Sequence, residues 1–338
     1  MRIGLTYDLR SEYLALGYSE EETAEFDREE TVQGIESALQ RLGHETDRIG
    51  NVQQLVKRLA QGNRWDLVFN IAEGMYGIGR EAQVPALLDA YSIPYTFSDP
   101  LVMSLTLHKG LTKCVVRDRG IPTSEFHVVS SLEDVAGVRF SAPYFIKPVA
   151  EGTGKGISSN SIVRRRKDLP DACCRLIESR QQPVLVERYL PGREFTVGIS
   201  GTGNAAQIIG TMEVLLLSSA EPGAYSYLNK ENYEDSVQYH FLRPDEDPLI
   251  AAVEDLALAA WRTLGCRDAG RLDLRCDARG RPQFIEVNPL AGLRPVHSDL
   301  CIICSMAGLT YDQLIERIVE SAAARIRLDH TERIRPCV

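Results

Sequence analysis

The 338-residue sequence predicts a protein of three lobes, of which the first is α/β and the other two are α+β. A chain of this length is too long for one small core. The first third alternates apolar strand patterns with helical ones, as βαβ units on a largely parallel sheet do. The rest combines alternating strands with a few helices. We expect the lobes at residues 1–104, 105–190 and 191–326, followed by a charged tail at 327–338.

In the first lobe, the apolar patterns predict strands at 3–7, 66–71 and 93–97. Apolar residues at helical spacing between 32 and 42 predict a helix that ends at Gly43. A glycine-rich turn at 74–79 leads into a second helix. The segment 13–27 is rich in glutamate and lacks core periodicity. We therefore expect this segment to be a mobile excursion near the mouth of the lobe.

In the second lobe, the patterns predict a helix at 107–119 and strands at 126–129, 144–147 and 183–187. In the third lobe, they predict strands at 194–200 and 206–217, a loop at 218–239 and a helix at 249–264. A last helix presents the apolar face Tyr311, Leu314, Ile315, Ile318 and Val319. The charged segment from Arg325 to Val338 is expected to be frayed.

A predicted hairpin at 271–275 and 284–288 is the most informative local pattern. Both segments alternate with period two, and the Asp-Ala-Arg-Gly between them favours a turn. We expect one face to carry Leu272, Leu274, Ile285 and Val287, and the other to carry Arg271, Asp273, Glu286 and Asn288. Carboxylate and amide oxygens suit magnesium ions that carry nucleotide phosphates. The pattern predicts a metal site at Asp273, Glu286 and Asn288, and a solvated face with a chance salt bridge is the alternative.

A second pattern follows the strand that ends at Lys147. The loop after Lys147 contains Gly152, Gly154 and Gly156, which let backbone amides approach an anion closely. Lys147 can reach the same phosphates as a point charge. The loop is not a P-loop, and an ordinary turn is the alternative. Two carboxylates follow, Glu187 and Glu194, around a segment that joins two lobes and can present acceptors to an adenine and a ribose.

In their order and combination, these motifs resemble the ATP-grasp superfamily, and specifically the D-alanine–D-alanine ligases. The resemblance covers about Asn70 to Ala322. It rests on Gly74 to Gln83, Ser104 to Lys109, Lys147-Pro148 with its glycine loop, Leu185 to Glu187, Glu194 to Val197, Gly270 to Asp273 and Ile285 to Asn288. It implies an ATP-grasp fold with ATP between the central and C-terminal lobes, where the first lobe is Rossmann-like. It also implies ATP and two magnesium ions as cofactors.

The resemblance implies a role for each matching residue. Phosphates would be bound by Lys109, Lys147, Lys230 and the loop that contains Glu151, Gly152, Gly154 and Gly156. Glu187 would bind the adenine amino group and Glu194 the ribose, while Asp273, Glu286 and Asn288 would hold the metal ions. Arg271, the amide of Gly292 and the hydroxyl of Thr153 would serve catalysis. Ser298 would lie near the carboxylate of the second substrate.

The activity that the resemblance implies is ATP-dependent carbon–nitrogen ligation. Phosphorylation turns an unreactive carboxylate into an acyl phosphate, and an amine then attacks it. Preorganised donors such as Arg271 stabilise the tetrahedral intermediate. Water must be excluded, so the segments 13–27, 152–156 and 218–239 are candidate lids.

Several positions depart from the family pattern. Thr153 and Gly154 stand where the ligases have two serines, and Lys155 adds a charge. Glu73 replaces a histidine, and Glu231 follows Lys230 where the family has an aromatic residue. Tyr7 to Arg10 stand where the ligases have a glycine pair, and Glu29 and Glu30 are only ambiguous counterparts of the family's substrate-orienting glutamate. After Asn288, the family's Thr-Ser-Pro-Gly is replaced by Pro289 to Gly292, which is followed by Arg294, His297 and Asp299. These changes gather where amino acids would bind, so we expect an active ligase of altered specificity.

Three of the altered side chains are candidate substrate contacts. Glu73 and Asp299 can each bind a substrate cation, and Arg294 can bind an additional carboxylate. A surface salt bridge is the alternative for each of them, and it is the favoured one for Arg294. The sequence does not decide the roles of these three residues or of Glu231.

Composition limits the partners. The net charge of −9 argues against nucleic acid, and no apolar run reaches the ~20 residues of a membrane span. The eight cysteines lack zinc spacing, which favours a reduced, cytoplasmic protein. We expect amino acids as substrates and, from the resemblance, a homodimer. A cell-wall dipeptide is the leading product. The alternatives are a dipeptide or amide ligase of a specialised pathway, a kinase that stops at the phosphate, and a non-catalytic nucleotide-binding regulator.

Overall fold

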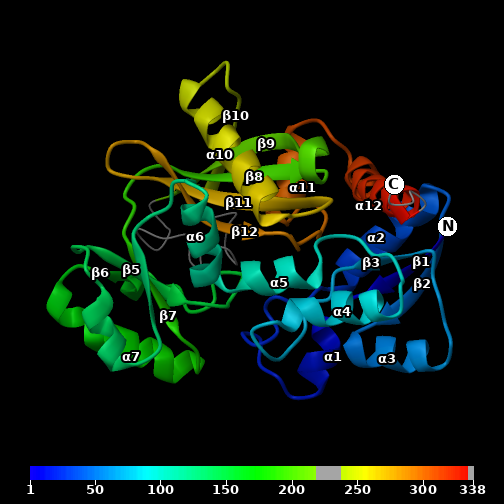
Figure 1. Cartoon of the computed structure of the whole chain (residues 1–338), viewed down its shortest axis with the longest axis horizontal. Helices are drawn as coiled ribbons and strands as arrows, with labels where there is room; N and C mark the ends of the chain where they lie inside the picture. Colours follow the sequence, from blue (N-terminus) through cyan, green and yellow to red (C-terminus); the bar gives the residue numbers. More distant parts are fainter. Residues whose placement is uncertain (218–236, 334–338) are drawn as a thin grey trace.

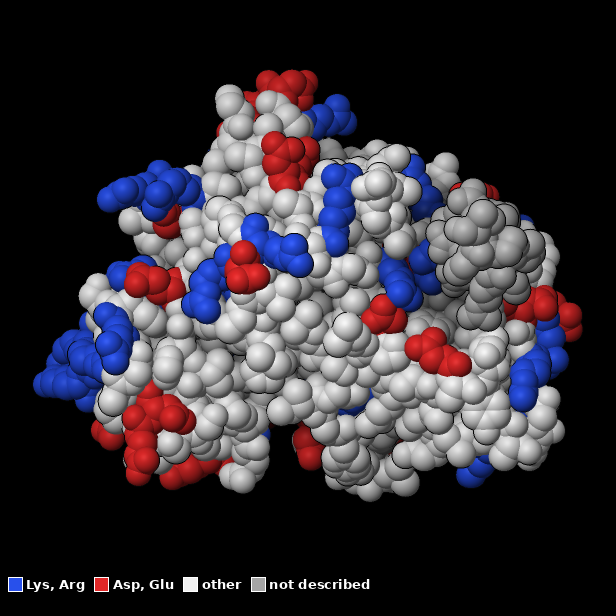
Figure 2. Space-filling view, viewed as in Figure 1, with Lys and Arg blue, Asp and Glu red and all other residues white. Residues whose placement is uncertain are grey.

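The computed structural model describes residues 1–217 and 237–333, and Figure 1 shows the arrangement of its three sheets. The strand orders are β2-β1-β3, β4-β7-β5-β6 and β10-β9-β8-β11-β12. In these two ranges, no helix has both the length and the hydropathy needed to cross a membrane. Figure 2 shows acidic and basic side chains interspersed on one face of the molecule.

The first sheet is parallel and contains β1 (Arg2–Thr6), β2 (Glu45–Gly50) and β3 (Leu67–Asn70). The helices of this region are α2 (Glu29–Arg41), α3 (Val52–Ala60) and α4 (Gln83–Ala90). The first two predicted strands and both predicted helices are confirmed. The strand expected at 93–97 forms only an isolated bridge from Tyr95 to Val68. The sequence patterns missed β2 because it is a polar edge strand with few buried residues.

The segment 13–27, expected as a mobile excursion because it lacks core periodicity, packs into the protein through several buried side chains. It follows α1 (Arg10–Ala15) and returns to the sheet region through a bridge between Leu9 and Asp27. Tyr13 and Phe26 are buried, with ring centroids 4.4 Å apart. One aromatic residue comes from a helix and the other from a turn, and this pairing leaves no periodic pattern in the sequence.

The second sheet contains β4 (Phe126–Val129), β5 (Tyr144–Pro148), β6 (Ile162–Val163) and β7 (Val184–Arg188), and α7 (Leu169–Arg180) packs against it. The helix expected at 107–119 is confirmed as α6 (Lys109–Asp118), and the preceding helix α5 (Pro100–Leu107) was not predicted. His108 separates them with a non-helical backbone, and its Nδ1 accepts a hydrogen bond of 3.1 Å from the Leu111 amide. This N-cap fixes the first turn of α6, which carries Lys109.

The third sheet is antiparallel and contains β8 (Glu194–Ser200), β9 (Gln207–Leu216), β10 (Val237–Leu242), β11 (Ala269–Cys276) and β12 (Pro282–Asn288). The helix α10 (Pro248–Leu264) covers one face, where Trp261 approaches Gly270. The helix α11 (Asp299–Met306) covers the other face beside Gly198, the pairing partner of Arg271. The expected loop at 218–239 ends too late, because β10 begins at Val237; residues 218–236 lie outside the described part of the chain.

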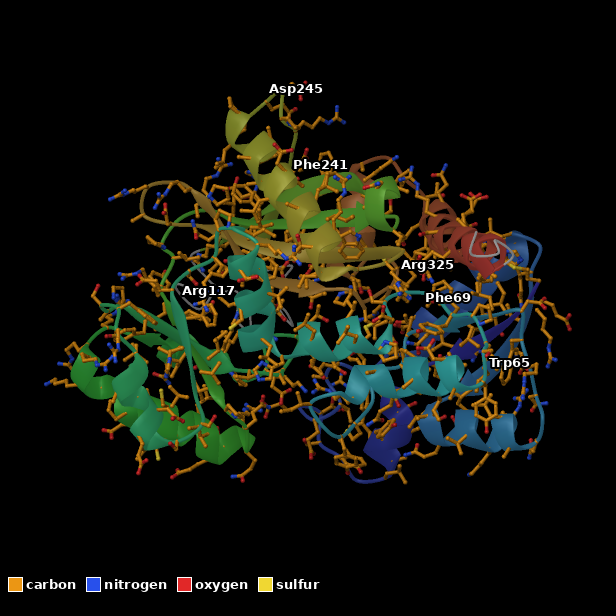
Figure 3. The ribbon with its side chains drawn as sticks, in the orientation of Figure 1. Trp65, Phe69, Arg117, Phe241, Asp245 and Arg325 are labelled. Atoms are coloured by element: carbon orange, nitrogen blue, oxygen red, sulfur yellow. The ribbon has the colours of Figure 1, made fainter. Side chains whose placement is uncertain are left out.

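The last helix, α12 (Tyr311–Arg333), packs on α2, and Leu314 and Ile318 share a core with Ile3 and Leu5 of β1. The chain therefore ends its fold against the sheet with which it began (Figure 1). Arg325, labelled in Figure 3, forms an ion pair with the buried Asp268, so the expected fraying does not begin at Arg325; residues 334–338 of that expected tail lie outside the described part of the chain. The helix also passes residue 326, where we expected the tail to begin.

Candidate active site

The hairpin of β11 and β12 places the predicted metal ligands together. Arg271 pairs with Asn288, and Asp273 pairs with Glu286. A bulge after Asp273 then shifts the register, so that Phe284 occupies the core in place of Ile285. The prediction that Ile285 faces the core is therefore wrong. Strict alternation fails at a bulge because one extra residue is inserted into one strand.

Oxygen atoms gather on the polar face of this hairpin. Asp273 accepts hydrogen bonds from Thr196 Oγ1 at 3.0 Å and from Asn288 Nδ2 at 3.4 Å. Arg271 donates to both oxygens of the Asp273 carboxylate, at 2.9 and 2.7 Å. Two carboxylates and an amide oxygen fit magnesium, whose remaining ligands in such sites are phosphate oxygens and water. The donor set therefore fits the predicted ion.

A cavity of about 870 Å³, partly open to solvent, lies beside this face and between the second and third sheets. Predicted nucleotide ligands and Ile285 line it together with side chains of β5, β7 and β8. The lining includes Lys109, Lys147, Glu151, Gly154, Lys155, Glu187, Tyr189, Leu190, Glu194, Asp273, Ile285 and Glu286.

Two predicted phosphate-binding lysines converge on Glu286. Lys147 Nζ lies 3.5 Å and Lys109 Nζ 3.7 Å from Glu286 Oε2, and Lys147 is also 3.2 Å from Glu187 Oε2. Burial disfavours the charged form of Lys147, but Glu187 and Glu286 outweigh it and raise its pKa. Lys147 therefore carries its positive charge in the cavity wall at neutral pH.

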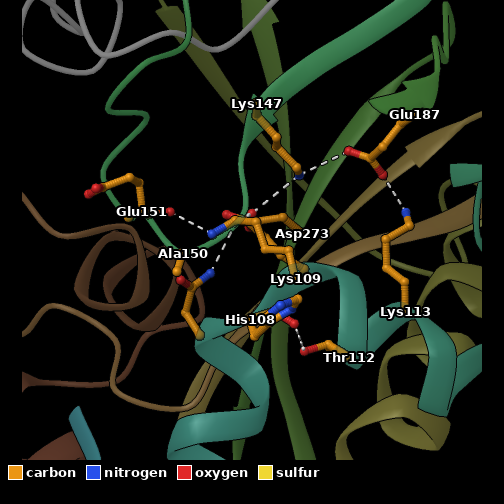
Figure 4. A network of polar contacts seen from close by, with 12 residues as sticks. His108, Lys109, Thr112, Lys113, Lys147, Ala150, Glu151, Glu187 and Asp273 are labelled. Atoms are coloured by element: carbon orange, nitrogen blue, oxygen red, sulfur yellow. Dashed lines mark hydrogen bonds and ion pairs between the residues drawn. The ribbon is translucent and has the colours of Figure 1, made fainter. Parts of the chain in front are cut away.

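Lys113 is part of this network, although the sequence analysis did not single it out. It is fully buried on α6, one turn after Lys109, and forms an ion pair with Glu187 Oε1. Figure 4 shows Glu187 held between Lys113 and Lys147. Burial raises the pKa of Glu187, but the two lysines outweigh it and lower the pKa to about 2. In the sequence, only the i,i+4 spacing of Lys109 and Lys113 indicates that both lysines lie on one face of the helix, and such pairs are commonly on solvated faces.

The glycine loop after β5 adopts backbone conformations that favour glycine. Gly154 and Gly156 have positive φ angles of 74° and 75°. The Gly152 amide donates to Glu25 Oε1, and a Cβ at Gly152 would lie 2.6 Å from that oxygen. Lys155 is paired with Glu25 at 3.2 Å and with Glu151 at 2.7 Å. The extra charge of Lys155 is thus compensated by Glu25, which the sequence analysis did not identify.

A second cavity, of about 680 Å³, continues from the first, and Lys109, Glu151 and Glu286 line both. It brings together the three predicted catalytic residues, Arg271, Gly292 and Thr153. Its other lining residues include Glu25, Glu73, Glu81, Gly152, Asn288 and Pro289. The turn at 73–81 thus faces the hairpin across one cavity.

The remaining candidates lie near this region in different settings. Ser298 Oγ accepts from the Arg294 amide at 3.0 Å and lies beside Gly292. Asp299 Oδ2 is 3.3 Å from Arg271, and Arg294 is paired with Glu30 at 3.0 Å, the salt bridge favoured for it. Glu194 Oε2 is 3.1 Å from Arg275. Lys230 and Glu231 lie outside the described residues.

Comparisons with known proteins agree with this arrangement. The family described as "D-ala D-ala ligase C-terminus" matches residues 115–320. The D-alanine–D-alanine ligase of Bordetella petrii is 31% identical over 295 residues, which cover 87% of this chain and 86% of that protein. That of Parvibaculum lavamentivorans is 32% identical over 296 residues, covering 86% and 91%. The uncharacterized protein y4sG of Sinorhizobium fredii is 32% identical over 301 residues, covering 86% and 87%.

Solved structures confirm the predicted ATP-grasp fold. The D-alanine–D-alanine ligase of Bacillus anthracis complexed with ATP superposes with a TM-score of 0.73, at 21% identity, over 98% of this chain and 99% of that chain. The VanG D-Ala:D-Ser ligase of Enterococcus faecalis superposes with a TM-score of 0.70, at 18% identity, over 95% and 99%. At these identities the likeness concerns the fold.

Proposed function

Since the chain belongs to the D-alanine–D-alanine ligase family, ATP-dependent ligases that join two amino acids into a dipeptide, we propose a division of labour between its two cavities. The larger cavity binds the magnesium–ATP complex. The second cavity binds the amino acid that is activated. The observation that carries this proposal is their shared wall of Lys109, Glu151 and Glu286, which brings a bound carboxylate next to the γ-phosphate.

In the larger cavity, the polar and apolar walls suit different parts of ATP. Lys109, Lys147 and the amides of the loop 152–156 bind the phosphates, which need positive charge and N–H donors. Glu194 accepts a hydrogen bond from a ribose hydroxyl, and Glu187 lies at the end of the cavity that binds the adenine. Ile285, released from the core by the bulge, gives the base an apolar surface. Asp273, Glu286 and Asn288 would hold magnesium, which would supply positive charge to the phosphates.

The reaction then has two bond-forming steps. A carboxylate oxygen of the first amino acid attacks the γ-phosphorus, the bond to the β–γ bridging oxygen breaks, and ADP leaves. The neutral amine of the second amino acid attacks the acyl carbon, the amide forms and inorganic phosphate leaves. Arg271 and the Gly292 amide donate to the oxyanion, and the Thr153 hydroxyl lies in the same cavity wall.

The test is phosphate release from ATP and magnesium with amino acids supplied singly and in pairs, starting with D-alanine, and with mass detection of the product. We expect release only with two amino acids, together with a dipeptide. Release with one amino acid and no dipeptide would identify a kinase. Nucleotide binding without release for any pair would contradict the proposal.

A variant pair connects this activity to the site. Glu286→Gln removes a magnesium ligand and should lower kcat at least about 100-fold, as the loss of a group that stabilises transition-state charge does. The matched control is Glu133→Gln, because Glu133 is exposed and lines neither cavity. Equal activity of the two variants would contradict the assigned role of Glu286.

We also propose a homodimer in the cytoplasm as the working form of the enzyme, on the family resemblance. Light scattering after size exclusion tests this assembly, and a monomeric mass at micromolar concentration would contradict it. Magnesium dependence is tested separately by titrating the ion into metal-free enzyme with ATP.

A further inference from the structure

We propose that the amino acid bound in the second cavity carries a cationic side chain, and that Glu73 and Glu81 recognise it. This inference rests on the proposed function, because it assigns that cavity to the activated amino acid. The ligand class is an amino acid with an ammonium or guanidinium group in addition to its α-amino group.

The first observation is that both carboxylates line the cavity without partners. Across the described parts of the chain, neither Glu73 nor Glu81 makes a hydrogen bond or an ion pair with its side chain. Other acidic residues of the same wall are engaged, since Glu25 pairs with Arg80 and Lys155, and Glu151 pairs with Lys155. Two carboxylates are therefore available to a ligand.

The second observation is that both carboxylates are half-buried in the cavity wall. Burial and the neighbouring carboxylates raise the pKa of Glu73 well above its ordinary value. Burial, together with Glu25, raises the pKa of Glu81 to about 7, although Arg80 opposes this. Both carboxyl groups therefore resist ionisation in the empty cavity. A cation bound beside them would favour their ionised forms and gain two charged acceptors.

The third observation is that the nearby cations are engaged with other groups. Arg80 donates to Glu25 and to the Ala150 carbonyl. Lys109 donates to the Glu151 carbonyl and faces Glu286. Arg271 donates to Asp273. Among the described residues none of these cations forms an ion pair with Glu73 or Glu81, although the charge of Arg80 lowers the pKa of both, so a direct ionic partner can come from a ligand.

The geometry also gives the ligand a direction. Glu73 and Glu81 come from the turn between β3 and α4, whereas Arg271 and Gly292 come from the hairpin region on the other side of the cavity. When the carboxylate of the bound amino acid lies beside Arg271 to react, the rest of that amino acid points toward the turn that carries Glu73 and Glu81. One α-ammonium compensates one carboxylate, and the presence of two calls for a second positive charge. Alanine, with one ammonium group, meets only part of this requirement.

The experiment compares cationic amino acids with neutral ones of similar shape. Lysine, ornithine and arginine are each assayed in both configurations against norleucine, citrulline and alanine, with ATP, magnesium and a second amino acid. We expect kcat/KM to be at least about tenfold higher for a cationic substrate, which is the effect of one favourable charge contact of about 1.4 kcal/mol. Lysine and arginine distinguish an ammonium from a guanidinium.

Variants then connect this preference to the two carboxylates. Glu73→Gln and Glu81→Gln should each raise KM for the cationic substrate about tenfold, while the KM for the neutral isostere changes less than about twofold. Glu133→Gln is the matched control, and thermal unfolding with ATP binding shows that each variant is folded. If a variant does not fold, Glu73→Asp and Glu81→Asp should retain the preference with a shorter reach.

The outcomes separate this inference from the proposed function. Dipeptide formation without a preference for cationic substrates would overturn the inference and leave the ligase intact. A cationic preference that survives both glutamine variants would overturn the assignment to Glu73 and Glu81. No ATP turnover with any pair would overturn the proposed function itself.

Discussion

The ammonium group of Lys155 lies 3.2 Å from the carboxylate of Glu25, in a contact that connects the glycine loop to the segment 13–27. Glu25 also pairs with Arg80 at 3.0 Å and accepts from the Gly152 amide. Arg180, at the end of α7, pairs with Glu21 of the same segment. A segment of the first lobe therefore holds the loop that we assign to the phosphates.

Glu25→Gln is expected to weaken this connection. The amide keeps an acceptor for the Gly152 N–H but leaves Arg80 and Lys155 without their shared negative charge. Removing one partner of a buried pair costs about 3–5 kcal/mol, so we expect the free energy of unfolding to fall by up to that amount. We also expect KM for ATP to rise severalfold. Steady-state kinetics and urea unfolding measure both; Glu12→Gln on the exposed face of α1 is the control, and an unchanged KM would contradict a role for Glu25 in holding the loop.

Lys113→Met is expected to destabilise the second sheet. The substitution keeps the length of the side chain and removes the charge that faces Glu187 inside the protein. An uncompensated buried carboxylate costs about 3–5 kcal/mol of unfolding free energy. Urea unfolding measures this loss, and the exposed Lys57→Met should change stability by less than about 0.5 kcal/mol. Equal stability of the two variants would show that Lys147 alone suffices for Glu187.

The ion pairs of Glu187 also predict a pH dependence. Its pKa falls from the ordinary 4.5 to about 2 in the folded protein, so its ionised form stabilises the fold. The contribution is full above pH 4.5 and is lost as the pH falls from about 4.5 to about 2. The difference in unfolding free energy between the wild type and Glu187→Gln should therefore shrink over this interval. A difference that stays constant from pH 6 to pH 2 would contradict the ion-pair assignment.

Ile285→Ala is expected to weaken nucleotide binding more than it weakens the fold. Its side chain lines the larger cavity and not the core, because the bulge after Asp273 turns it outward. Burying an isoleucine against a ligand contributes about 1.5–3 kcal/mol, so we expect the Kd for ATP to rise about tenfold or more. Calorimetric titration with ATP checks this, with the exposed Leu101→Ala as the control. A loss of stability without a change in ATP affinity would instead indicate that the Ile285 side chain packs in the core.

Much of the fold followed from local pattern. The strands at 126–129 and 194–200, the helix α10 and the polar face of the β11–β12 hairpin all have strong periodicity. The sequence patterns missed the polar edge strand β2, the short apolar helix α5 and the packing of the segment that buries Tyr13 and Phe26. The roles assigned to Glu187, Glu194 and Ser298 stay predictions, and so do the lobe boundaries.

The sequence by itself determined the family, the fold and the set of charged residues around the hairpin, because alternation along a strand decides which side chains share a face. Only the tertiary structure decided what lies opposite that face. Glu25, Glu81 and Lys113 come from segments far apart along the chain. Packing of the lobes brought Glu25 and Glu81 to the wall of one cavity and buried Lys113 against Glu187. Enclosure removes water from charged groups, so it determines which carboxylates find a lysine or arginine and which are left for a ligand.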